Sequence, residues 1–379
     1  MLNIEHLRLY LLAKRGCTED TPFGEDLLTF RVLGKIFACI DLTRPDRVVL
    51  KTTPARSGEL YARYSAIFGA WHWNKQHWLE AIFGGDASDA FILKLADEAY
   101  AAVLHGLPKK RQIAFFQEGL PTDVHFLHAN TCTSTNDLAL SLCDTDFDGE
   151  KCDFALIHSD LQRRGRGQQG TCWESQNGKN LTFSFVVTPD FLPPAQSFRL
   201  LQAAAVAIVR ALGPLLADCS APIAIKWPND IYFGDSKLCG TLIQNVVSGD
   251  VLRHSIVGIG LNVNQLDFSE NLPNPVSLAQ ILGVEINRFL LLERIVSEFR
   301  QIYFTLRDSI FNNRLNLFEL IENEYLANLY RRVGTYAWRD AGGQFRAAID
   351  TVLPDGTLRL RLSAGTVRAY AFKEVEFVI

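Results

Sequence analysis

A short charged run around a proline is the part of the sequence best suited to chemistry. Lys226-Trp227-Pro228-Asn229-Asp230 is followed by Lys237 within Ser236-Lys237-Leu238-Cys239-Gly240. Pro228 fixes its own φ and pushes Trp227 toward an extended conformation, so the run predicts a defined bend between two short apolar segments. Lysines can neutralise phosphate charge, and a carboxylate can accept a proton. Such a set suits a site that joins a carboxylate to ATP and then deprotonates an amine.

A loop rich in glycine and arginine lies upstream. It reads Gln162-Arg163-Arg164-Gly165-Arg166-Gly167-Gln168-Gln169-Gly170, and Trp173-Glu174-Ser175 and the strand-like run 180–187 follow it. The same loop spells G-x-G-x-x-G, which in a dinucleotide-binding fold needs a helix directly after it and an acidic residue about twenty positions on. Because a β-rich run follows here, the dinucleotide interpretation is disfavoured.

Four separated motifs together resemble the biotin protein ligase family. They are Ser134-Thr135-Asn136, the glycine and arginine loop, the region 226–240, and Gly258-Ile259-Gly260-Leu261-Asn262-Val263-Asn264. The resemblance implies a biotin--[acetyl-CoA-carboxylase] ligase that uses ATP and Mg²⁺ to convert biotin to biotinyl-5′-AMP. It also implies transfer of biotin to a lysine of a biotin carboxyl carrier protein, a subunit of acetyl-CoA carboxylase or of another biotin-dependent carboxylase.

The resemblance implies roles for single residues as well. Lys237, Asp230 and Arg166 would be catalytic, with Arg166 holding a lid over the adenylate. The biotin-binding residues would be Ser134, Thr135, Gln162, Gly165, Gly167, Lys237 and Gly240. The ATP-binding residues would be Arg166, Trp173, Lys237 and Asn262, and no protein metal site is expected. Gln168 and Gln169 stand where one form of the family has a further arginine, so adenylate retention would rest more on the arginines before them.

Simpler interpretations of these residues stay open at this point. Asp230 could make an Asx turn after Pro228, Lys237 could be a solvated lysine, and Lys226 is as well explained by a framework cation as by a phosphate contact. A lipoate ligase or octanoyl transferase would share the catalytic fold but lack the Lys-Trp-Pro-Asn-Asp run. Regulatory ligases usually carry an N-terminal winged helix-turn-helix, and a purely DNA-associated module would not need the ligase motifs.

The first part of the chain predicts a separate α+β unit. Apolar residues at helical spacing predict a helix that stops at Gly16, the runs 27–32, 35–42 and 48–50 predict strands, and a helix is expected over about 89–104. The unit resembles the MmcQ/YjbR family in several runs. They are Thr18-Glu19-Asp20, Pro22-Phe23-Gly24, Lys35-Ile36-Phe37-Ala38, Leu50-Lys51, Trp71-His72-Trp73-Asn74-Lys75-Gln76-His77-Trp78 and Leu107-Pro108-Lys109-Lys110.

The family label suggests DNA binding by this unit, but its charge does not. Residues 1–111 hold 15 Lys and Arg against 13 Asp and Glu, far from the basic footprint of a strong DNA binder. The aromatic and basic cluster 71–78 could stack on bases or hold a phosphate, but an aromatic core with histidines at its rim is favoured because tryptophan buries a large area. DNA binding by the N-terminal unit is therefore possible and unproven.

The rest of the chain predicts two further domains. Residues 112–130 are expected to be a connector, followed by helices over 136–143, 198–216 and 290–309 with strands around the motifs. From Arg331 onward the sequence alternates tightly and predicts strands joined at glycine turns. We therefore expect an α+β chain made of a CyaY-like unit (1–115), a class II synthetase-like mixed sheet with helices as catalytic domain (116–325), and an SH3-like β-barrel (326–379).

Composition agrees with a cytoplasmic enzyme. Hydrophobic residues make up 48% of the 379 residues and charged residues 21%, ordinary values for a globular protein, and the net charge of −4 disfavours indiscriminate nucleic-acid binding. The eight cysteines show no zinc or C-x-x-C spacing, which fits reduced thiols. The N-terminus does not read as a signal peptide, and no apolar run is expected to span a bilayer, so we expect no membrane partner.

Overall fold

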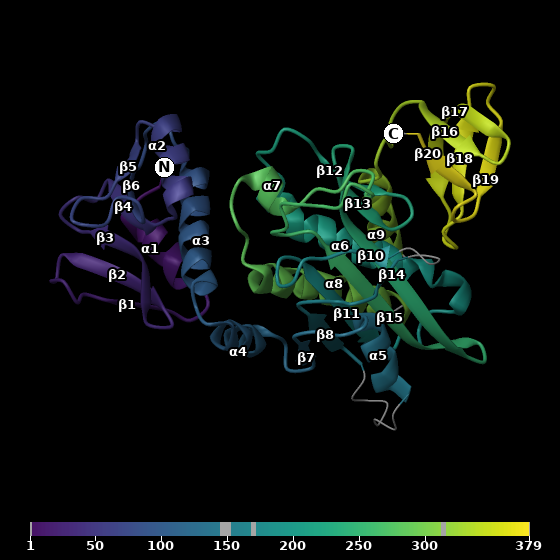
Figure 1. Ribbon diagram of the computed structural model, residues 1–379, viewed down its shortest axis with the longest axis horizontal. Coiled ribbons are helices and arrows are strands. Elements are labelled where there is room, and N and C mark those ends of the chain that lie inside the picture. The colour runs from purple at the N-terminus through teal and green to yellow at the C-terminus, as the bar shows by residue number, and fades with distance from the viewer. Residues whose placement is uncertain (1, 145–152, 168–171, 312–315, 379) are drawn as a thin grey trace. The chain divides into compact units, whose positions relative to one another are not determined.

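The computed structural model describes residues 2–144, 153–167, 172–311 and 316–378. The chain divides into two compact units, Met1–Gly119 and Leu120–Ile379 (Figure 1). Both units combine helices with mostly antiparallel sheets, so the expected α+β class is confirmed.

The first unit is one antiparallel sheet with helices. The strand order is β1-β2-β3-β4-β6-β5. The strands are β1 (Cys17–Asp20), β2 (Leu27–Val32), β3 (Lys35–Asp41), β4 (Arg47–Lys51), β5 (Ile67–Gly69) and β6 (Trp78–Ile82). The helices are α1 (Ile4–Leu12), α2 (Pro54–Arg63), α3 (Asp89–His105) and α4 (Lys109–Gly119). Helix α3 packs on β3 and β4, because its residues Ile92, Leu95 and Ala99 form a buried stripe at helical spacing.

Two features of this unit differ from the sequence expectation or refine it. Residues 109–119 form α4, so the prediction of a connector from residue 112 is wrong up to Gly119. Pro108 directly precedes the helix, where proline is well tolerated, and Phe115 and Phe116 on the helix are buried. The aromatic cluster is split: the Trp73 and Trp78 rings lie 4.3 Å apart and Trp78 is buried, whereas Trp71 is 65% exposed.

The second unit is built on a seven-stranded sheet. Its order is β12-β13-β14-β15-β11-β8-β7, and only β7 and β8 are parallel to each other. The strands are β7 (His125–Ala129), β8 (Ala155–Ser159), β11 (Leu181–Val187), β12 (Ile223–Lys226), β13 (Asp230–Phe233), β14 (Ser236–Ser248) and β15 (Val251–Leu261). A small ladder beside it pairs β9 (Gly165–Arg166) with β10 (Cys172–Trp173). The helices are α5 (Thr135–Asp144), η3 (Pro194–Gln196), α6 (Phe198–Leu216), α7 (Leu278–Leu282), α8 (Arg288–Phe311) and α9 (Asn316–Ala327).

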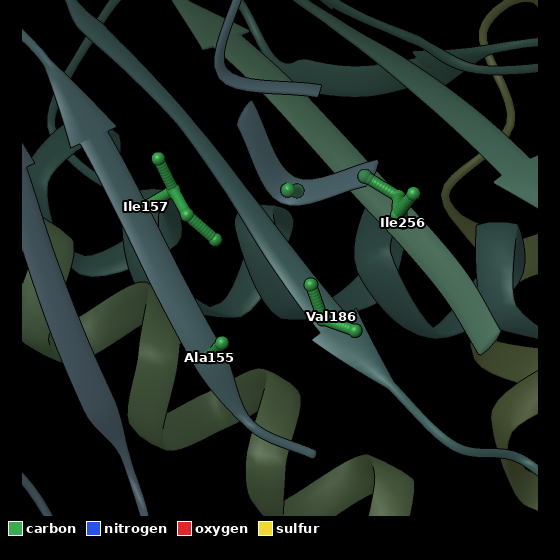
Figure 2. Close-up of a cluster of buried hydrophobic side chains, with 5 residues drawn as sticks. Ala155, Ile157, Val186 and Ile256 are labelled. Carbon is green, nitrogen blue, oxygen red and sulfur yellow. The ribbon is translucent and has the colours of Figure 1, made fainter. Parts of the chain in front are cut away.

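Helices cover both faces of this sheet. Helix α5 packs through Ala139 on Ile157, Val186 and Ile256, side chains of three neighbouring strands (Figure 2). On the opposite face, Phe185 stacks on Phe299 of α8 at a ring distance of 5.0 Å. Because successive side chains of a strand point to opposite faces, Phe185 and Val186 place α8 and α5 on different sides. All residues of β8 and β11 are accordingly buried.

Helix α6 is the most apolar of the helices in the second unit. Together with η3 it forms the stretch Pro194–Leu216, which by length and composition alone could cross a membrane, contrary to the expectation that no run would be long enough. However, 72% of its most apolar window is buried inside the protein, as in the core helix of a soluble domain. This stretch is therefore weak evidence for a membrane span.

The C-terminal residues form a separate five-stranded antiparallel sheet. Its order is β19-β18-β17-β16-β20. The strands are β16 (Tyr336–Asp340), β17 (Gly343–Val352), β18 (Leu358–Leu362), β19 (Val367–Tyr370) and β20 (Val375–Phe377). Trp338 of β16 and Phe377 of the edge strand β20 are both buried and pack against each other, with ring centroids 3.7 Å apart. The expected strands are confirmed, but within the described residues no pairing closes β19 onto β20, so a closed barrel is not seen.

Candidate active site

A pocket of about 430 Å³ opens where the loops of the second unit meet the strands β13, β14 and β15. The motifs singled out from the sequence converge on it, although they are spread over more than a hundred residues of the chain. Its lining includes Ser134, Thr135, Gln162, Arg166, Gly167, Trp173, Asp230, Lys237, Gly240 and Asn262. Among the predicted site residues, Gly165 alone is not part of that lining.

The centre of the pocket is an ion pair between two predicted catalytic residues. Lys237 Nζ lies 2.8 Å from Asp230 Oδ1, and the two side chains are 34% and 19% exposed. Strand β12 and strand β13 form a hairpin with Lys226 opposite Asp230, and Asp230 in turn lies opposite Gly240 of β14. The bend predicted around Pro228 therefore exists, and it places a lysine and a carboxylate side by side at the pocket.

The hairpin turn is held by side chains from distant parts of the unit. The Asn229 side chain donates to the backbone oxygen of Thr241, and the Asn229 carbonyl accepts from the Thr241 N–H at 3.1 Å. The Tyr325 hydroxyl donates to the Pro228 carbonyl at 3.0 Å, and the Trp227 indole N–H donates to the Gly356 carbonyl at 3.0 Å. These bonds fix the direction of Asp230, which the bend alone would not do.

Trp173 lies flat against two strands that glycine keeps clear. A Cβ at Gly260 would sit 2.4 Å from Trp173 Cε2, and a Cβ at Gly240 would sit 3.3 Å from Trp173 Cζ3. Lys237 Nζ lies 6.0 Å from the centre of the indole ring. Because Gly240 and Gly260 are opposite each other in the sheet, the two glycines form a bare platform for one aromatic ring. The indole Nε1 is buried without a hydrogen-bond partner among the described residues.

One end of the pocket is a network of neutral polar groups at the start of α5. Gln162 Oε1 accepts from the Thr135 N–H at 2.7 Å and from the Thr135 hydroxyl at 3.2 Å. The Ser184 hydroxyl lies 2.6 Å from Asn136 Oδ1, and the Asn136 amide donates to Gln244. With its oxygen already engaged, Gln162 is oriented to donate from its amide nitrogen. This end can therefore match a neutral ligand that carries both acceptors and donors.

Arg166 lies at the rim of the same end. Its guanidinium NH2 nitrogen is 2.8 Å from Asp137 Oδ1, and its side chain is 51% exposed. Gly165 pairs with Trp173 across the β9–β10 ladder, and a Cβ there would lie 2.4 Å from the Trp173 carbonyl oxygen. Gly165 therefore allows the loop to approach the strand that carries Trp173. Gln168 and Gln169 lie outside the described residues.

Asn262 and a following loop position the backbone of Lys237. The Lys237 N–H donates to Asn274 at 2.7 Å, and its carbonyl accepts from Val276 at 3.0 Å. The Asn262 side chain is buried and donates to the Val276 carbonyl at 3.1 Å. Asn262 thus fixes the loop that in turn holds Lys237.

Comparisons with known proteins identify two families in the chain. Residues 133–262 match the model of the biotin/lipoate A/B protein ligase family, and residues 12–102 match the YjbR family. The second unit carries a domain of the biotin/lipoate A/B protein ligase family. The first unit carries a YjbR domain. The chain is also 32% identical over 92 residues to the uncharacterised protein YbdF of Escherichia coli O157:H7, a match that covers 24% of this chain and 75% of that protein.

Among relatives of the ligase-family domain are proteins named as ligases. The bifunctional ligase/repressor BirA of Bacillus spizizenii is 32% identical over 202 residues, 52% of this chain and 60% of that protein. A biotin--[acetyl-CoA-carboxylase] ligase of Paracoccus denitrificans is 38% identical over 104 residues, 27% of this chain and 41% of its own. The chain thus spans less than two thirds of the length of each of these two relatives.

A solved structure shows the same fold. The biotin protein ligase of Aquifex aeolicus, solved in complex with biotin and ATP, superposes with a TM-score of 0.53 at 21% sequence identity. The superposition covers 67% of this chain and 99% of that one. The ligase-family domain therefore has the fold of that enzyme.

Several lining residues of the ligase-family domain were not expected from the sequence. They are Asn136, Cys172, Glu174, Asn229, Tyr232, Phe268, Leu272, Pro273, Asn274, Pro275 and Lys373. Asn136 and Asn229 belong to motifs that were recognised, so only their role was missed. The loop 268–275 and Lys373 lie outside every motif. No local pattern could have found them, because strand pairing and side-chain packing at a distance bring them to the pocket.

One buried cluster in the ligase-family domain has the residue types of a metal site. The candidate ligand atoms of His128, His158 and Asp160 all lie within 4.8 Å of one another. The two Nδ1 atoms of His128 and His158 are 3.0 Å apart, and Asp160 meets His128 Nε2 and the Arg288 guanidinium, each at 3.2 Å. The Arg288 guanidinium already pairs with Asp160, and its positive charge would repel a metal ion bound to the same carboxylate. We therefore interpret the cluster as a set of polar contacts that fixes the start of the glycine and arginine loop.

Proposed function

We propose that the chain is a biotin protein ligase. It would convert biotin and ATP to biotinyl-5′-AMP and pyrophosphate and then transfer biotin to a lysine of a carrier protein. The observation that carries the proposal is the 2.8 Å pair of Lys237 and Asp230 in a pocket lined by all four motifs. The names of the relatives support the same activity.

In the first step, an oxygen of the biotin carboxylate attacks the α-phosphorus of ATP. A bond forms between that oxygen and phosphorus, the bond to the bridging oxygen breaks, and pyrophosphate leaves. Lys237 would neutralise the carboxylate and the α-phosphate as negative charge shifts between them. Trp173 would give the adenine a flat apolar surface, and Asn262 would fix the loop that holds Lys237.

In the second step, the amine of the carrier lysine attacks the acyl carbon of the adenylate. A C–N bond forms, the C–O bond to AMP breaks, and the amine must lose a proton. Asp230 would orient this amine and accept its proton, because it lies at the pocket next to Lys237. Arg166 would leave Asp137 and bind the adenylate phosphate, keeping water away from the anhydride.

Mg²⁺ would enter with ATP. Mg²⁺ is usually bound through substrate phosphates and one or two carboxylates rather than in a protein cage. The carboxylates among the described lining residues are Asp230 and Glu174, so the donor set fits a metal held mainly by the nucleotide. Mg²⁺ would supply charge neutralisation of the phosphates.

Biotin is favoured over lipoate by the polar end of the pocket. The ureido ring of biotin has two N–H donors and a carbonyl acceptor, which Ser134, Thr135 and Gln162 could match. The dithiolane ring of lipoate would leave these groups without partners, and an unpaired buried polar group is costly. We infer further biotin contacts from Gly165, Gly167 and Gly240, which let backbone groups approach the ligand.

The partner and the domain plan belong to the same proposal. We infer a biotin carboxyl carrier protein as acceptor, in the cytoplasm, because a relative is named for acetyl-CoA carboxylase. The working division is 1–115 as a CyaY-like YjbR domain, 116–325 as a class II synthetase-like catalytic domain and 326–379 as an SH3-like domain. DNA binding by the first unit stays a prediction that a salt series on the isolated unit would test, since phosphate contacts give a steep salt dependence.

The test is pyrophosphate release from ATP by the full chain with one acid at a time. Release should require biotin, and lipoate or octanoate should leave it at background. Equal release with lipoate, or none with biotin, would refute the proposal.

A further inference from the structure

A cation from the C-terminal sheet reaches the pocket. Lys373 lies in the turn between β19 and β20 and is part of the pocket lining. The other cationic residues of the described lining are Arg166, Lys226 and Lys237. Lys373 comes from a different sheet and from far along the chain, so its presence there depends on how that sheet packs.

The turn that carries Lys373 is fixed on the ligase-family domain. The neighbouring ring of Phe372 lies 5.5 Å from Trp227 and 5.9 Å from Phe198. The Trp227 indole also donates to the Gly356 carbonyl in the loop before β18. A Cβ at Gly356 would sit 2.8 Å from Phe198, so the two sheets meet closely there. The hairpin turn beside Asp230 and the turn that carries Lys373 are therefore clamped together.

The backbone of this turn is closed and held in an uncommon conformation. The Ala371 N–H donates to the Glu374 carboxylate at 2.7 Å, and the Glu374 N–H donates to the Ala371 carbonyl at 3.2 Å. Lys373 has φ +67°, in the left-handed region that favours glycine.

The charge of Lys373 is available to a ligand. Arg166 is paired with Asp137 and Lys237 with Asp230, and the Lys226 ammonium donates to the Tyr232 hydroxyl at 3.2 Å. No ion pair or hydrogen bond of the Lys373 side chain occurs within the described parts of the chain. The residue is exposed and belongs to the pocket lining, so its ammonium group is accessible to a bound anion.

We propose that Lys373 binds the β- and γ-phosphates of ATP and the pyrophosphate formed from them. This inference rests on the proposed adenylation. In the proposed reaction, Lys237 meets the biotin carboxylate and the α-phosphate, and the neutral network around Gln162 meets the acyl end. Lys373, in the turn clamped beside the Trp227–Asn229 turn, would meet the polyanionic tail, which carries more charge than Lys237 alone can neutralise.

The test compares Lys373→Gly, Lys373→Arg and a control, Arg339→Ala. Glycine removes the charge and suits the positive φ, so this variant should fold at least as well as the wild type, as a thermal melt will check. Arginine keeps the charge. Arg339 is an exposed cation of the same sheet, paired with Glu376 at 3.1 Å, and does not line the pocket.

The measurement is biotin-dependent exchange of labelled pyrophosphate into ATP, followed by transfer to a carrier domain. Lys373→Gly should raise the KM for ATP and the inhibition constant of pyrophosphate by roughly tenfold, the loss expected for one charge-assisted contact, and leave the KM for biotin unchanged. Lys373→Arg should restore most of this loss, and Arg339→Ala should change nothing.

Two results would overturn the assignment of Lys373. One is an unchanged KM for ATP in Lys373→Gly, and the other is a rise confined to the KM for the carrier, which would make Lys373 a protein-docking residue. Calorimetric titration of each variant with Mg²⁺ and ATP gives a second measure of affinity that needs no turnover. A wild-type protein that binds ATP but shows no biotin-dependent exchange would refute the proposed function instead, and the calorimetric comparison would still decide the role of Lys373.

Discussion

Replacing Lys237 with alanine tests whether Lys237 is a catalytic residue or an ordinary surface lysine. At the 2.8 Å between Lys237 Nζ and Asp230 Oδ1, two unit charges attract by about 1.5 to 6 kcal/mol for effective dielectric constants of about 80 to 20. Because the lysine side chain is 34% exposed, desolvation and side-chain entropy offset most of this, and the folded state should lose about 1 kcal/mol or less.

The effect on the reaction should be much larger than the effect on stability. A preorganised charge aimed at the developing charge of a transition state is worth about 2.7 to 4 kcal/mol, or roughly 100- to 1000-fold in rate. Lys237→Ala should therefore lower biotin-dependent pyrophosphate exchange by that factor. Lysine 179 offers a matched control, because Lys179 Nζ lies 2.8 Å from Glu285 Oε1 with 45% exposure and is not part of the pocket lining.

The assay measures initial exchange rates at saturating ATP and biotin for wild type, Lys237→Ala and Lys179→Ala, each with a thermal melt. The two variants should melt within a few degrees of the wild type and differ strongly in rate. Similar rates in both variants would refute the catalytic role of Lys237. A large loss of melting temperature in Lys237→Ala alone would show that the pair is structural.

Three further changes test other parts of the account. Arg166→Gly should still form the adenylate but release it, so that bystander proteins become biotinylated; mass spectrometry of labelled sites checks this, and strict carrier selectivity would contradict the lid role of Arg166. Gly260→Ala should displace Trp173, because the new Cβ would lie 2.4 Å from that ring, and should raise the KM for ATP by roughly tenfold or more. Gly213→Ala in α6 is the control and should leave the KM for ATP unchanged, because a Cβ there meets nothing within 4 Å. A chain that begins at Leu120 should keep carrier biotinylation within about two- to threefold of the full chain, since the first unit is compact by itself, and loss of transfer in a folded truncation would place that unit in the catalytic assembly.

The sequence predicted best what is local. The helix expected over 198–216 is α6, with the same bounds, because its long apolar stretch has no competing pattern. The bend around Pro228 was expected from proline geometry and is the β12–β13 hairpin. The predicted site residues, Gly165 apart, also line one pocket, since each motif follows or ends a strand of the same sheet.

The sequence did not reveal contacts between distant segments. The bond from Trp227 to Gly356 joins residues 129 positions apart, and neither residue alone signals it. Lys373 reaches the pocket because that bond and the packing of Phe372 on Trp227 and Phe198 hold the two sheets together. The pair of Arg166 and Asp137 was missed for the same reason. Helix α9 is a different case, since Phe318, Ile321 and Tyr325 are buried at helical spacing and could have predicted it.

The most direct test of the central claim is a comparison of acids in one exchange assay with the full chain. Labelled pyrophosphate should enter ATP when biotin is supplied, and lipoate, octanoate and no acid should all give the same background. Exchange that is equal with lipoate would contradict the reading of the Ser134, Thr135 and Gln162 end as a site for the ureido ring. Absence of exchange with biotin would contradict the proposal that the chain is a biotin protein ligase.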